Sequence, residues 1–88
     1  MKVQYKNKFL KELSKIPSKT RKDIEHFVFT EVPNSKSIFE TGKIEKMKGY
    51  PFHYKTRFGA YRLGIRVVDD KLIFERVLHR KDIYRYFP

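Results

Sequence analysis

The residues that decide the fold lie between positions 52 and 68, where the sequence reads FHYKTRFGAYRLGIRVV. Apolar and polar side chains alternate in both halves of this stretch, and Gly59-Ala60 separates the halves. Alternation with a period of two is typical of a strand with one buried face, and a short glycine-containing link between two such runs is typical of a hairpin. The stretch therefore predicts two antiparallel strands, Phe52–Phe58 and Tyr61–Val68.

A third strand is expected directly after this hairpin. Asp69-Asp70 supplies a second turn, and Lys71–Leu78 contains isoleucine, valine and phenylalanine, which favour strands. Consecutive strands that are joined by tight turns pair antiparallel, so these strands would form a meander. His79–Tyr86 would follow as a terminal loop or a single helical turn.

Upstream of the meander, the spacing of apolar residues predicts two helices. The first would span Lys8–Ile16, and the second would span Lys19–Val32 after the break at Pro17. Asn7 and Ser18 are the expected caps of these helices, because their side chains can accept hydrogen bonds from free backbone N–H groups. Since the connection between them is so short, the helices would form an antiparallel hairpin.

The other segments carry weaker signals. Lys2–Tyr5 is a candidate strand at the sheet edge or beside the meander, and Lys36–Glu40 is a candidate helical turn. Thr41–Gly49 is polar and basic, with only Ile44 and Met47 to anchor it. The order of elements predicts an α+β fold in a single domain, residues 1–88, with an N-terminal strand and a helix hairpin packed on one face of an antiparallel meander.

The composition favours a polyanionic partner. There are 21 Lys and Arg residues against 10 Asp and Glu residues, a net charge of +11 that would attract nucleic acid, an anionic membrane or an acidic protein. The membrane is the weakest of these, because no apolar run approaches the ~18 residues of a spanning helix. The first residues lack the apolar stretch of a signal peptide, and no cysteine is present to form a disulfide. We therefore expect a cytoplasmic protein.

The alternation along the two hairpin strands places basic residues together on one face. If the apolar residues face the helices, the open face carries Lys55, Arg57, Arg62 and Arg66. Cross-strand neighbours lie about 4.5–8 Å apart, so these cations would repel one another without a counter-charge. Alternating charges on a strand often mark nothing more than a solvated face, but such faces usually mix signs and this one does not. A phosphodiester backbone is a natural counter-charge.

The end of the third strand brings further reactive side chains to one end of the sheet. His79 could shuttle a proton near neutral pH, and Arg80 could bind a phosphate with two hydrogen bonds. Tyr84 could stack on an unpaired base or pass a proton, although each of these residues could equally be structural. We also expect Lys48, Arg66 and Lys81 to bind substrate.

Several common kinds of site are missing from the sequence. The three histidines show no ligand spacing, no acidic pair suits Mg²⁺, and the four glycines are isolated, so neither a metal, a cofactor nor a phosphate-cradling loop is expected. The remaining scheme is metal-free RNA cleavage, in which the 2′-hydroxyl of the substrate attacks the adjacent phosphate. The protein then needs only a base, an acid and cations that stabilise the transition state.

At this point the sequence resembles a known family. Residues 47–57 (MKGYPFHYKTR), 61–63 (YRL), 79–85 (HRKDIYR) and 8–17 (KFLKELSKIP) together resemble the RelE/ParE toxin superfamily, across the whole chain. The resemblance implies a microbial-ribonuclease-like fold and a toxin that is neutralised by an antitoxin, which we expect to be acidic. RelE-type members cut mRNA in the ribosomal A site, so mRNA and the ribosome are the expected partners.

The resemblance also implies roles for individual residues. The family's basic pair falls on Lys55 and Arg57, its transition-state arginine on Arg62, its second arginine on Arg80 and its late tyrosine on Tyr84. The chain departs from the best-known pattern in three ways: arginine replaces lysine at position 57, a histidine precedes Arg80, and the spacing from Arg80 to Tyr84 is shorter. The general base could therefore be Lys55 or His79.

Three functions compete at this stage. The leading hypothesis is a metal-independent endoribonuclease toxin that inhibits translation. A gyrase-poisoning toxin of the ParE branch would share the fold without nuclease chemistry. The third alternative is a non-catalytic module that binds only RNA or the antitoxin.

Overall fold

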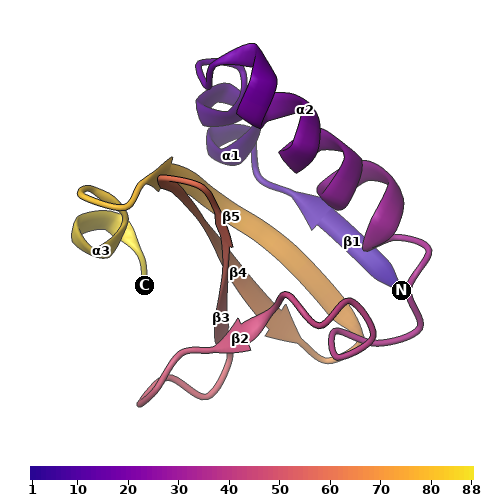
Figure 1. Ribbon diagram of the computed structural model, residues 1–88. Helices are drawn as coiled ribbons and strands as arrows, with labels where there is room; N and C mark the ends of the chain where they lie inside the picture. Colours follow the sequence, from indigo (N-terminus) through magenta and orange to yellow (C-terminus); the bar gives the residue numbers. More distant parts are fainter.

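A five-stranded sheet with helices on both faces forms the protein (Figure 1). The structure is a computed structural model that describes all residues, Met1–Pro88. Its elements in chain order are β1 (Lys2–Tyr5), α1 (Asn7–Leu13), α2 (Ser18–His26), the π-helical turn η1 (Phe27–Glu31), β2 (Glu45–Lys46), β3 (His53–Phe58), β4 (Tyr61–Val68), β5 (Lys71–His79) and α3 (Ile83–Tyr86).

The predicted meander forms the centre of the sheet. The strand order is β1-β5-β4-β3-β2, in which β3, β4 and β5 pair antiparallel through the two expected turns. The first strand lies at the edge and pairs with β5 in parallel, with Val3 opposite Leu72. The two-residue strand β2 was not predicted, and it forms the other edge by pairing with β3.

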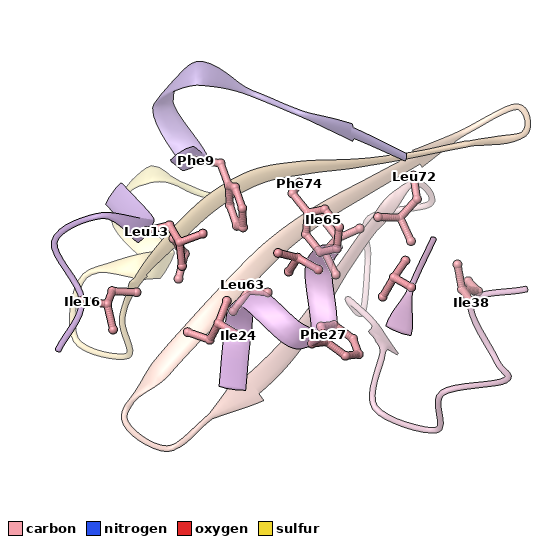
Figure 2. Close-up of a cluster of buried hydrophobic side chains, with 13 residues drawn as sticks. Phe9, Leu13, Ile16, Ile24, Phe27, Ile38, Leu63, Ile65, Leu72 and Phe74 are labelled. Atoms are coloured by element: carbon pink, nitrogen blue, oxygen red, sulfur yellow. The ribbon is translucent and has the colours of Figure 1, made fainter. Parts of the chain in front are cut away.

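The main core lies between the helix hairpin and one face of the sheet, which we call the helix-side face. Figure 2 shows Phe9 and Leu13 of α1 directed toward Leu63, Ile65 and Phe74 of the sheet. All of these side chains are buried. At about 1.5–3 kcal/mol for each fully buried large apolar side chain, this layer is the main source of stability. The α+β fold and the predicted inward-facing residues of β4 are confirmed.

Four expectations about the helical segments are wrong. The helix α1 ends at Leu13 instead of Ile16, and α2 gives way to the wider π-helical turn at Phe27. Neither expected cap is used, because Lys6 and Pro17 occupy the cap positions and no side chain bonds to the free N–H groups. The segment around Lys36–Glu40 forms turns and bends instead of a helical turn.

The opposite face of the sheet, which we call the outer face, is partly covered by the C-terminus. Ile83 of α3 and Phe87 pack there with Met47 and the half-buried Leu78. Phe87 lies directly over Gly64, where a Cβ atom would come within 2.6 Å of the ring. The expectation that helices cover only one face is therefore wrong for α3, because the absence of a side chain at Gly64 lets the tail approach the strand.

A β-bulge in β5 changes which face its last residues occupy. Gly64 pairs with Arg76 and Ile65 pairs with Phe74, so Glu75 is the extra residue. Because a bulge reverses the alternation that follows it, Leu78 faces outward and His79 faces the helix side. Beyond β1, the free edge of β5 is covered by Glu12, which accepts a hydrogen bond from the Val77 backbone N–H at 3.1 Å.

Candidate active site

A hollow on the outer face brings together four of the residues expected to act on RNA. It has a volume of about 280 Å³ and is lined by Lys55, Arg57, Arg62, Tyr84 and Glu45. The strand β3 supplies Lys55 and Arg57, β4 supplies Arg62, and α3 supplies Tyr84 from above the sheet. The strand alternation explains the first three positions, whereas Tyr84 arrives only because α3 docks on the outer face.

The strand register fixes the spacing of the basic groups. Arg57 lies directly opposite Arg62, and Lys55 lies opposite Gly64. The Lys55 Nζ atom lies 3.5 Å from the Tyr84 hydroxyl oxygen and 5.8 Å from the centre of its ring. The Tyr84 side chain is 58% exposed, so its ring is available to a ligand. These side chains form a cationic site with an exposed aromatic surface beside it.

Arg62 is held in place by the turn that follows β3. Its Nη1 atom donates to the backbone oxygens of Gly59, at 2.8 Å, and Tyr61, at 3.0 Å. Gly59 has a φ of +58°, a backbone conformation that glycine adopts without strain. Both of these hydrogen bonds use Nη1, so Nε and Nη2 of the same guanidinium remain for a bound phosphate.

Glu45 is the residue of this site that sequence reasoning missed. It lies in β2 opposite Lys55 and is the only carboxylate that lines the hollow. The sequence around it shows no strand alternation, and β2 exists only because it pairs with β3. An ionised carboxylate among cations can accept a proton, and it also lowers the net positive charge of the site.

His79 does not join the other candidate residues. It pairs with Tyr61 in the sheet, and the two rings are 5.7 Å apart on the helix-side face. There it lines a separate hollow with Glu12 and Lys15, and its Nδ1 accepts the Lys81 backbone N–H. The bulge at Glu75 places it there, so the structure separates His79 from Lys55, Arg57 and Arg62 by the thickness of the sheet.

The four other expected residues do not line the hollow. Arg80 and Lys81 are exposed just after β5, and the Arg80 backbone N–H donates to Ala60 at 2.7 Å. Lys48 is exposed in the turn after β2. Arg66 is engaged by Glu75 at 3.0 Å, so its charge is already partly neutralised.

The side chains that line the hollow combine cations, a carboxylate and a tyrosine ring. Nowhere in the chain do three His, Asp or Glu side chains gather in a way that could hold a metal ion. No helix has the length and apolar character needed to cross a membrane. What the hollow offers is two arginines that can bind a phosphate, a lysine and a carboxylate that can exchange protons, and an aromatic ring.

Comparison with known proteins gives matches along nearly the whole chain. The family model described as "ParE toxin of type II toxin-antitoxin system, parDE" matches residues 3–84. A curated protein named Toxin RelE3, from Methanocaldococcus jannaschii, is 46% identical over 89 residues, with full coverage of both chains.

Solved structures agree with these sequence matches. A chain of the RelB–RelE antitoxin–toxin complex from Methanococcus jannaschii aligns with a TM-score of 0.80 and 43% identity, covering 97% of this chain and 99% of the other. The isolated RelE toxin of E. coli aligns with a TM-score of 0.68 and 26% identity, covering 89% of this chain and 82% of the other.

Proposed function

Since the chain belongs to the RelE/ParE toxin superfamily and is the toxin of a toxin–antitoxin pair, we propose that it is a metal-independent endoribonuclease that cleaves mRNA in the ribosomal A site. The observation that carries this proposal is the convergence of Lys55, Arg57, Arg62 and Tyr84 on one hollow. This function would inhibit translation, with mRNA, the ribosome and the antitoxin as partners. It would place the protein in the cytoplasm, where translation occurs.

The first step of the reaction is attack by the 2′-hydroxyl of the substrate on the adjacent phosphorus. A base removes the hydroxyl proton while the phosphate gains negative charge. Arg57 and Arg62 lie opposite each other in the sheet, so one phosphate group can contact both guanidinium groups. Preorganised charges aimed at the developing negative charge are worth about 2.7–4 kcal/mol for each donor.

Two lining groups can take part in the proton transfers. Glu45 can accept a proton without first losing one, whereas Lys55 must be neutral before it can act as a base. A protonated Lys55 can instead donate to the 5′-oxygen that leaves. The position of His79 on the helix-side face favours Glu45 or Lys55 over His79 as the base.

Tyr84 supports a base next to the scissile phosphate in this scheme. Its exposed ring lies beside Lys55, so a base that leaves the stack can rest on the ring while its phosphate meets the cations. Recognition of single-stranded RNA commonly relies on such stacking, which is worth about 1–3 kcal/mol per base. Arg80, Lys48, Arg66 and Lys81 would contact the strand outside the hollow.

Inducible expression followed by mapping of mRNA 5′ ends tests the proposal. Cuts inside translated codons are expected, with 5′-hydroxyl ends and 2′,3′-cyclic phosphate or 3′-phosphate ends. Products with 5′-phosphate ends would indicate activated water instead and would overturn the scheme. Binding to translating ribosomes without any cleavage would favour a non-catalytic module.

Gyrase poisoning is the second candidate, because the matching family model is described as a ParE toxin. The cationic hollow argues against it, since poisoning of gyrase needs no RNA-cleaving groups. Accumulation of gyrase–DNA cleavage complexes on expression, with intact mRNA, would establish this alternative.

A further inference from the structure

The helix hairpin carries a second strongly basic surface on the side of the sheet opposite the candidate active site. Residues 6–22 contain seven basic residues and one acidic residue, which is more than half of the net charge of +11. Six of the seven are lysines with exposed side chains, which we call the hairpin lysines: Lys6, Lys8, Lys11, Lys15, Lys19 and Lys22. Figure 1 shows α1 and α2 together on one side of the sheet and α3 apart from them.

The hairpin lysines are spaced so that they form a continuous surface. Lys8 and Lys11 are three residues apart on α1, away from the buried Phe9 and Leu13, and Lys15 follows four residues later in the turn after the helix. At the start of α2, Lys19 and Lys22 repeat the spacing. Because the connection at Pro17 is short, the two lysine rows meet at the tip of the hairpin.

Three acidic residues lie on α1 and α2, and two of them are engaged, whereas Asp23, four residues after Lys19, is exposed and forms no ion pair. Glu12 forms an ion pair with Arg76, whose Nη2 lies 2.6 Å from Oε2, and it also accepts the Val77 backbone N–H. Its hydrogen bond to Arg76 raises the pKa of that guanidinium. Glu25 lies 3.9 Å from Arg21. None of the hairpin lysines forms an ion pair within the chain, so their charges remain available to a partner.

The surface suits a phosphate backbone better than a protein. A protein interface needs buried apolar anchors at its centre, and Leu10 is the only large apolar side chain exposed on either helix, α1 or α2. Lysine ammonium groups on flexible stems bind phosphates as point charges and require no fixed geometry. The most exposed aromatic side chains, Phe39, Tyr84, Phe52 and Tyr86, all lie outside this hairpin.

We infer that the hairpin lysines form a second RNA-binding surface, which holds the backbone of a folded RNA while the outer face takes a single strand. The hollow on the outer face and the tip of the hairpin lie at the same end of the sheet, since Lys15 lines a hollow with Tyr61 and His79 next to the turn that positions Arg62. A short single strand in the hollow cannot reach both faces. A large folded RNA with a cleft around this end can, and this inference rests on the proposed function for the identity of the single strand.

Two RNA probes distinguish the two surfaces. The first is the purified small ribosomal subunit, and the second is a short oligoribonucleotide whose 2′-hydroxyls are methylated so that it cannot be cleaved. The variant K8Q/K11Q/K15Q should bind the subunit on the order of tenfold more weakly at physiological salt. The plot of log affinity against log salt should become shallower by about two to three, because each lysine–phosphate contact contributes about 0.9 to its slope. Binding of the oligoribonucleotide should not change.

Matched variants control for charge and folding. K2Q/K36Q/K71Q removes the same charge from exposed lysines at the opposite end of the sheet and should bind the subunit nearly normally. K8R/K11R/K15R keeps the charge and should restore both the affinity and the slope. The double variant K55Q/R57Q should lose the oligoribonucleotide and keep most of the subunit affinity.

Three outcomes would overturn the inference. Unchanged subunit binding by K8Q/K11Q/K15Q would leave the hairpin as a solvated face, or as a surface for the antitoxin if antitoxin binding is lost instead. Equal loss in K2Q/K36Q/K71Q would show that only net charge matters. Loss of both probes in the hairpin variant would show that the surfaces are not separate. Because neither probe is cleaved, these results do not depend on whether the proposed cleavage chemistry is correct.

Discussion

At the scale of single residues, Arg62 is the side chain with the best-defined position in the hollow. Its Nη1 donates to the backbone oxygens of Gly59 and Tyr61, so Nε and Nη2 remain free for a ligand in the hollow that Arg62 lines. We expect Arg62→Ala to reduce cleavage by a factor on the order of 10²–10³, the usual loss for one transition-state donor. The rate of single-turnover mRNA cleavage on ribosomes measures this reduction. Arg85→Ala, which removes an exposed arginine of α3 that does not line the hollow, is the control. A folded Arg62→Ala protein with normal activity would remove Arg62 from the mechanism.

Two substitutions distinguish the possible roles of the Tyr84 side chain. If its ring supports a base, Tyr84→Phe should keep most of the activity, and Tyr84→Ala should lose roughly ten- to a hundredfold. Melting temperature should change little in either variant, because the side chain is 58% exposed. Equal inactivity of both variants would show that the hydroxyl, 3.5 Å from Lys55 Nζ, carries out a proton transfer instead. Unfolding of the alanine variant would indicate a structural role.

Two hypotheses about the role of Glu45 predict opposite effects of its substitution on activity. As a general base it would be needed for cleavage, and Glu45→Gln should lower kcat/KM by about 10²–10⁴. As a simple counter-charge it would weaken RNA binding, and the same substitution should raise affinity without reducing the rate. We expect the first result, because no other lining group is an ionised acceptor. Separate measurements of the single-turnover cleavage rate and of RNA affinity, in the wild-type protein and in Glu45→Gln, decide between them.

At the scale of elements, the docking of α3 on the outer face is what completes the site. The ring of Phe87 occupies the space over Gly64, and a Cβ atom there would lie 2.6–2.9 Å from three ring atoms. Gly64→Ala should therefore displace Phe87 and with it α3 and Tyr84, at a cost of about 1–3 kcal/mol in unfolding free energy. Cleavage should fall, although the main core on the helix-side face is untouched.

A double-mutant cycle checks that explanation. Phe87→Ala removes the ring that the new methyl group would meet, so Gly64→Ala should add little in its presence. Chemical denaturation of the four proteins gives the coupling free energy. Additive effects of the two substitutions would show that Gly64 acts through the strand backbone rather than through contact with Phe87.

At the scale of the whole molecule, we expect the net charge of +11 to contribute to binding of the antitoxin. We expect an acidic antitoxin segment to cover the outer face or to displace the Lys81–Phe87 tail. Binding through exposed charge pairs should weaken as salt rises, since such pairs are screened beyond about 8 Å at physiological ionic strength. Titration calorimetry across a salt series measures this. Tight binding that is insensitive to salt would indicate a helix seated in an apolar groove instead.

The sequence by itself determined the meander and the cationic face of its first hairpin. Alternation in Phe52–Phe58 and Tyr61–Val68 is a local property, and a strand with one buried face cannot slip by one residue without exposing its apolar side. The turns at Gly59-Ala60 and Asp69-Asp70 set the register. The alternation and the turns are therefore sufficient to place Lys55, Arg57 and Arg62 together on one face.

Only the tertiary structure decided the remaining members of the site. Glu45 joins because β2, which has no strand pattern of its own, pairs with β3. Tyr84 joins because the C-terminal tail packs over Gly64. The bulge at Glu75 places His79 on the helix-side face, and the local sequence pattern of β5 does not predict this bulge. Each of these placements depends on contacts between segments far apart in the chain, and local periodicity carries no information about such contacts.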